Sequence, residues 1–143
     1  MTNWQIAMLA ALPLCLGPVR FRTWAAMLAS GLAGHWISSL YPAPVLAFVL
    51  IDVVAALIIL ARPKGVFQHY IGCIYVGMIC SHVGYIFASN PLAITVYYGL
   101  LTAAGWLAWF LLFCWGAGDV GKRIGARLGI RWFAPHRPSA ARQ

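Results

Sequence analysis

The chain has 143 residues, of which 63% are hydrophobic and 8% charged, with ten Lys and Arg against two Asp, for a formal net charge of +8. A soluble domain is usually about 25% charged, so this composition cannot cover a water-facing surface and predicts a chain that lies in a bilayer. A few spans of roughly 20 residues each use nearly the whole length, which excludes a soluble catalytic domain, a dinucleotide fold or a nucleic-acid reader.

Uninterrupted apolar stretches bounded by charge or proline predict the spans. In chain order they cover residues 4–19, 23–41, 43–61, 69–89 and 92–115. The first stretch is the shortest, and Pro13 and the Gly17–Pro18 pair are expected to bend it or end it early, so an interfacial or re-entrant segment is the alternative. The predicted fold is all-α: residues 1–118 form a polytopic transmembrane helical bundle of about five spans, or four if the first segment does not cross.

The basic residues fall on alternate connections, after the first, third and fifth stretches. They are Arg20 and Arg22, then Arg62 and Lys64, then Lys122, Arg123, Arg127, Arg131, Arg137 and Arg142. Because basic loops stay cytoplasmic, this pattern predicts a multi-pass protein of a bacterial-type inner membrane with its C-terminus in the cytoplasm and its N-terminus outside. The short connections predict antiparallel helical hairpins.

A weak internal repeat is also visible. The shift that brings His35 onto His82 also brings Pro44 onto Pro91, so the second and third spans resemble the fourth and fifth. Parallel repeats of this kind occur in membrane carriers, whose sites form where the repeats meet. Asp52 falls on Gly99, so the second copy has no acidic residue at that position.

Three ionisable residues, His35, Asp52 and His82, lie well inside the predicted spans. At 1.5 Å per residue they are about 9, 13 and 10 Å from the nearest span ends, so they share a depth. Ionisable groups in a membrane face the bundle interior and often mark ion or proton pathways. One hypothesis is a His–Asp–His proton or cation pathway, and another is a haem b held by the two histidines. In the structural alternative, Asp52 is protonated and only holds helices together. The sequence contains no metal-binding motif, and the leading expectation is that the protein binds no cofactor.

Small residues recur every four positions on two predicted spans. They are Ala26, Ser30, Gly34 and Ser38 on the second, and Cys73, Gly77 and Ser81 on the fourth. Such stripes let helices approach closely in lipid. The sequence therefore predicts helix packing through these residues, either inside one chain or between chains of a homo-oligomer.

The segment 119–143 is predicted to be a basic amphipathic cytoplasmic tail with a disordered end. If it is helical, its basic residues meet the anionic headgroups of the bilayer; they are Lys122, Arg123, Arg127 and Arg131. No recognition helix, finger or aromatic platform accompanies them, so no nucleic-acid partner is expected.

The sequence offers no catalytic motif: it has no plausible Ser–His–Asp set, no P-loop and no paired carboxylates. The leading hypothesis is therefore a protein without catalytic activity. In its small size, its lack of extramembrane mass and its short basic tail, the chain is similar in layout to holins, the small lysis proteins of phages. That resemblance implies a pore former that acts by assembling in the bilayer, and an accessory subunit of a larger membrane complex is the related hypothesis. The alternatives are a small proton- or cation-coupled carrier that uses His35, Asp52 and His82, and a bis-His haem protein.

Overall fold

The computed structural model describes residues 12, 17–41, 44–62, 65–88 and 92–127. Four α-helices account for nearly all of this part of the chain: α2 (Pro18–Leu40), α3 (Val45–Leu60), α4 (Val66–Phe87) and α5 (Leu92–Arg127). The all-α prediction is confirmed. The predicted first span, 4–19, lies mostly outside the described residues, and so does Arg131.

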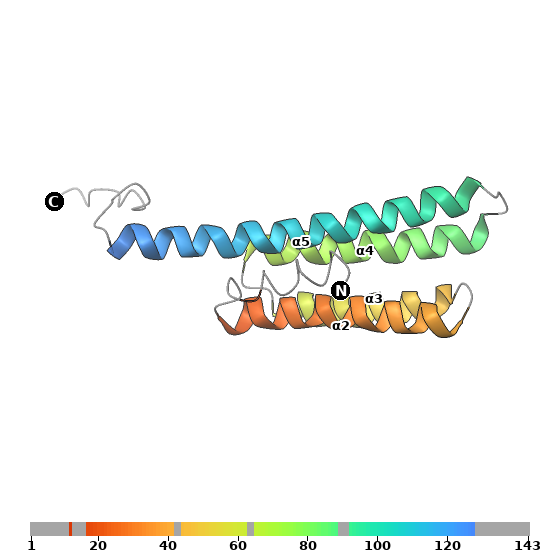
Figure 1. The fold of residues 1–143 in the computed structure, drawn as a ribbon, viewed down its shortest axis with the longest axis horizontal. Coiled ribbons are helices and arrows are strands. Elements are labelled where there is room, and N and C mark those ends of the chain that lie inside the picture. Colours follow the sequence, from red (N-terminus) through yellow and green to blue (C-terminus); the bar gives the residue numbers. More distant parts are fainter. Residues whose placement is uncertain (1–11, 13–16, 42–43, 63–64, 89–91, 128–143) are drawn as a thin grey trace, which may run out of the picture.

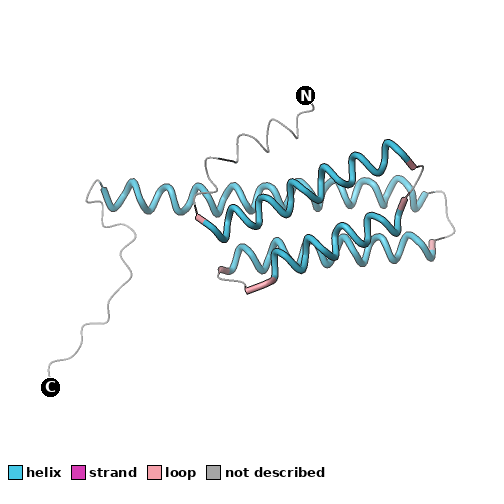
Figure 2. The backbone as a smooth tube through the Cα atoms, turned by 90° about the horizontal axis from the view of Figure 1, so that it is seen from below, coloured by secondary structure: helices cyan, strands magenta, loops and turns pink. Residues whose placement is uncertain are grey.

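The helices run alternately up and down as two hairpins, α2–α3 and α4–α5 (Figure 1). Helix α3 packs against both α2 and α4, and α4 packs against α5, whereas α2 and α5 meet only sparsely. The C-terminal part of α5 extends beyond the end of the other three helices (Figures 1 and 2). Short connections between the described helices impose this antiparallel order, as the sequence predicts.

Helix α2 begins earlier than the predicted second span, which started at residue 23. Gly17 has φ 130, a left-handed conformation that favours glycine, and Pro18 occupies the first helical turn, where its fixed φ suits a helix start. Arg20 and Arg22 therefore lie in the first turns of α2, not in a connection. The prediction failed here because charge was used as the boundary, although arginine is a good helix former.

Two of the helices, α4 and α5, are long and apolar enough to cross a membrane. Helix α3 is apolar but has only 16 residues, since it starts after Pro44 and ends where Ala61 becomes extended. At 1.5 Å per residue it is about 24 Å long, a little less than a bilayer's hydrocarbon thickness. Helix α5 runs without a break through Gly118 to Arg127, so Lys122, Arg123 and Arg127 lie exposed on its last turns.

The core lies between the hairpins and is small. Met27, Ile59, Ile71 and Leu112 are fully buried there. Gly72 marks a close approach of α4 to α3, because a Cβ at this position would overlap the side chain of Leu60. The outer faces carry many large apolar side chains, among them Trp36, Leu46, Phe87, Val96 and Phe110.

The predicted packing stripes are only partly used inside the chain. Ala26 is buried, and Gly34 lies against the ring of Phe48. In contrast, Gly77 is exposed with nothing within 4 Å of a Cβ, and the hydroxyls of Ser81 and Ser38 donate to carbonyls of their own helices. Packing through Gly77, Ser81 and Ser38, inside one chain or between chains, stays a prediction. Helix α4 instead turns another face inward, formed by Gln68, Ile71, Gly72, Tyr75 and His82.

Candidate functional site

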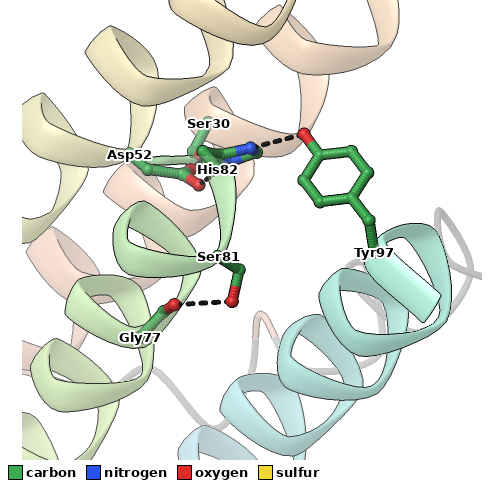
Figure 3. Close-up of polar contacts among 6 residues, drawn as sticks. All are labelled: Ser30, Asp52, Gly77, Ser81, His82 and Tyr97. Atoms are coloured by element: carbon green, nitrogen blue, oxygen red, sulfur yellow. Dashed lines mark hydrogen bonds and ion pairs between the residues drawn. The ribbon is translucent and has the colours of Figure 1, made fainter. Parts of the chain in front are cut away.

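A buried carboxylate lies at the centre of the four helices. Asp52 of α3 is 4% exposed, and its Oδ2 is 3.0 Å from Nε2 of His82 on α4. Its other oxygen, Oδ1, accepts a hydrogen bond of 3.2 Å from the Ser30 hydroxyl on α2 (Figure 3). The carboxylate therefore receives a partner from each neighbouring helix, as a buried charged group requires.

The His82 imidazole is bonded on both sides. It is 2% exposed, and its Nδ1 lies 2.5 Å from the Tyr97 hydroxyl of α5. The Phe48 ring stacks on the imidazole at a centroid distance of 5.9 Å, and Tyr85 stacks on Tyr97 at 4.2 Å. These contacts fix the plane of the imidazole between Asp52 and Tyr97.

This arrangement accommodates two protonation states of His82. With Nε2–H donating to Asp52, a neutral imidazole accepts at Nδ1 from the Tyr97 hydroxyl, whereas an imidazolium donates from Nδ1–H to the Tyr97 oxygen. A hydroxyl can play either role by rotating its proton. The chain Asp52–His82–Tyr97 can thus hold or release one proton while every hydrogen bond is kept.

A cleft of about 400 Å³ lies beside this network and draws residues from all four helices. Helices α2 and α5, which meet only sparsely, both line it together with α3 and α4. Its polar lining consists of Ser30, His35, Ser38, Asp52, His82, Tyr98 and Thr102. Both members of the Asp52–His82 pair therefore form part of the cleft wall.

A second ion pair lies at the other end of the bundle. Arg20 Nη1 is 3.1 Å from Asp119 Oδ2, which ties the start of α2 to the last turns of α5. The neighbouring Arg22 donates from Nη2 to the carbonyl of Ala61, at the end of α3. Basic residues from separate parts of the sequence are thus gathered at the end of the bundle where α2 begins, α3 ends and α5 approaches its C-terminus; this end can be followed in Figure 1 by the ends of the labelled helices.

The structure brings two of the three predicted site residues, Asp52 and His82, into direct contact. His35 lines the same cleft from the exposed face of α2. Sequence reasoning missed Tyr97 and gave Ser30 only a packing role. A signal for Tyr97 was available, because His82 and Tyr97 lie at nearly the same distance from the Asn90–Pro91 turn, and a hairpin brings such positions to one depth.

The bis-His haem hypothesis does not fit this geometry. Both ring nitrogens of His82 are engaged, by Asp52 and by Tyr97, so neither is available to an iron atom in this arrangement. Within the described residues, no group of three or more His, Cys, Asp or Glu side chains is placed to hold a metal ion.

No family model, curated protein or solved structure matches this chain. The buried Asp52–His82–Tyr97 network and the cleft beside it are therefore the features that carry a functional inference.

Proposed function

We propose that the chain is a polytopic inner-membrane carrier that exchanges a proton held on the Asp52–His82–Tyr97 network for a small solute bound in the adjacent cleft. One observation carries the proposal: a buried imidazole, bonded on both sides, forms part of the wall of an open cleft. Ionisable groups at such positions in membrane proteins commonly belong to proton or ion pathways.

A bilayer setting is supported by composition and by the outer surface. Charged residues are scarce, α4 and α5 are long apolar helices, and the exposed faces present side chains such as Leu46 and Phe87, which are 71% and 81% exposed. Contiguous apolar surface of this kind belongs in lipid or in an interface. The proposed bundle has four or five spans, depending on whether the segment before α2 crosses.

The proposed orientation places the Arg20–Asp119 end in the cytoplasm. Arg20, Arg22 and Arg62 belong to this end together with the basic turns of α5, as expected when positive charge stays inside. Reporter fusions after Arg62 and after Gln143 should therefore both report a cytoplasmic location. Fusions that report opposite sides would overturn the proposed threading.

The carrier hypothesis is tested in proteoliposomes that contain a trapped pH indicator. Solutes of cationic, neutral and anionic classes are added outside, and proton movement is recorded. Wild-type protein should move protons in response to at least one class, and Asp52→Asn should not. Asp119→Asn is the matched control, because it makes the same change at the second aspartate, which does not line the cleft. Failure of every class with wild-type protein would refute the carrier.

Assembly in the bilayer, as a holin-like pore or as an accessory subunit, is a second candidate. The exposed face of α4 favours it, since Gly77 and Gly84 leave open space there that a second helix can fill. Under this hypothesis Gly77→Leu should reduce the mass of the particle purified in mild detergent to that of one chain, and overexpression of the wild type should collapse the membrane potential. A monomeric wild type that accumulates harmlessly would reject it.

A further inference from the structure

We infer that the solute taken up by the cleft is a monovalent organic cation of the ammonium type, which occupies the site when His82 has given up its proton. This inference rests on the proposed carrier function and names the substrate class of the same site.

The first support is the sign of charge in the cleft. Among the described residues that line the cleft, Asp52 is the sole acidic one and none is Lys or Arg; the other titratable groups there are His35, His82 and Tyr98. When His35 and His82 are both neutral, the described lining therefore holds one uncompensated negative charge, which attracts a cation and repels an anion.

The second support is the aromatic part of the wall. Phe48 from α3 and Tyr98 from α5 both line the cleft. Phe48 stacks on the His82 ring, and Tyr98 meets the Tyr97 ring edge-on at a centroid distance of 5.0 Å. Aromatic faces attract organic cations through the negative charge of the ring face. The two rings that would contact the cation, Phe48 and Tyr98, therefore pack directly against His82 and Tyr97 of the proposed proton site.

The third support separates an organic cation from a metal ion. Hard metal cations require about six oxygen ligands at short distance, but the described lining supplies a single carboxylate, and that carboxylate already accepts from Ser30 and His82. A volume of about 400 Å³ with several apolar side chains suits a small organic molecule instead.

Charge balance explains why uptake of the cation and release of the proton are linked. Asp52 carboxylate with protonated His82 has no net charge, and neither has Asp52 carboxylate with neutral His82 and one bound ammonium ion. The other two combinations leave a net charge of one unit in a site surrounded by apolar helices, which is strongly unfavourable. The site should therefore alternate between the two neutral states, and each cation that enters should displace one proton.

The experiment uses the full chain purified in mild detergent and three probes of similar size: benzyltrimethylammonium, benzyl alcohol and benzoate. Benzyltrimethylammonium should bind at least about tenfold more tightly than the neutral and anionic probes, a difference of about 1.4 kcal/mol. Because this cation has no titratable proton of its own, its binding in weakly buffered solution should release about one proton per molecule bound, as read from a pH indicator. Asp52→Asn should abolish both signals, and Asp119→Asn should keep them.

Phe48→Leu tests the aromatic wall and should weaken binding of the cation about tenfold with little effect on benzyl alcohol. If this variant does not fold, Tyr98→Leu replaces it, since Tyr98 is 48% exposed and contributes little to the core.

Equal binding of the three probes, or cation binding without proton release, would overturn the inference. The carrier function is judged from a different measurement, proton movement in proteoliposomes. If benzyl alcohol or benzoate drives proton movement that depends on Asp52 in proteoliposomes, the carrier function stands and the cationic substrate is wrong.

Discussion

The two acidic residues of the chain form two ion pairs of nearly equal length and of different chemistry. Asp52 lies 3.0 Å from His82, and Asp119 lies 3.1 Å from Arg20. A guanidinium keeps its proton, whereas an imidazole can exist as a neutral or as a protonated ring. The Arg20–Asp119 pair is therefore a permanent link between α2 and α5, and the Asp52–His82 pair can change its net charge.

The surroundings of the two ion pairs also distinguish them. The Asp52 side chain is 6% exposed and forms part of the cleft wall, while that of Asp119 is 37% exposed at the end of the bundle, one turn before Lys122 and Arg123. A short distance between opposite charges thus says little about the role of the pair. The partner's ability to titrate and its access to a binding space distinguish a candidate functional pair from a structural one.

The largest expected contrast is in transport. Asp52→Asn should lower solute-driven proton movement in proteoliposomes by at least about 100-fold, or roughly 2.7 kcal/mol, because the amide cannot stabilise an imidazolium. Asp119→Asn should change it by less than about twofold once the amount of inserted protein is equalised. Equal losses in both variants would abolish the distinction between the two pairs.

The next effect concerns the stability of the permanent pair. Removal of one partner should leave the other charge poorly compensated, and Arg20 is the more buried side chain, at 7% against 37% exposure. Asp119→Leu should therefore lower the free energy of unfolding by about 2–3 kcal/mol, and Arg20→Leu by less. The double variant should recover part of the loss in a mutant cycle measured by denaturation in detergent. A larger loss for Arg20→Leu would contradict this order.

A smaller effect is expected at Tyr97. Tyr97→Phe removes the hydroxyl that serves both protonation states of His82, so proton-coupled exchange should slow about tenfold. Exchange of labelled for unlabelled benzyltrimethylammonium needs no proton transfer and should stay within about twofold of wild type. A parallel loss in both assays would mean that Tyr97 only supports the packing of the site.

The smallest effect concerns the close approach of α4 to α3 at Gly72. Gly72→Ala places a Cβ against Leu60 and should lower the free energy of unfolding by about 1–3 kcal/mol. Gly77→Ala, on the open face of the same helix, should change it by no more than about 1 kcal/mol, in either direction. Equal destabilisation by the two substitutions would show that the close approach is not the cause.

Much of the organisation follows from local patterns in the chain. Long apolar runs predict helices, short charge-free connections predict hairpins, and the alternation of basic residues matches their gathering at one end of the bundle. The common depth of Asp52 and His82 also followed from counting residues along helices. The early start of α2 was missed because the prediction placed the boundary at the two arginines. In the structure the helix begins at the positive-φ glycine and the proline that precede them.

The rotation of each helix about its axis did not follow from the sequence. Helices α3 and α4 are apolar on nearly every side, so hydrophobic periodicity does not indicate which side meets a neighbour. Only the packed structure turned Gly72, rather than Gly77, toward α3, and only it placed the Tyr97 hydroxyl on His82. The amino-acid sequence by itself determined the helices, their order and the level of the ionisable groups, because these depend on composition and spacing along the chain. The tertiary structure alone decided which polar groups meet, because in an apolar chain that choice is made by close packing and by the need of each buried polar atom for a partner.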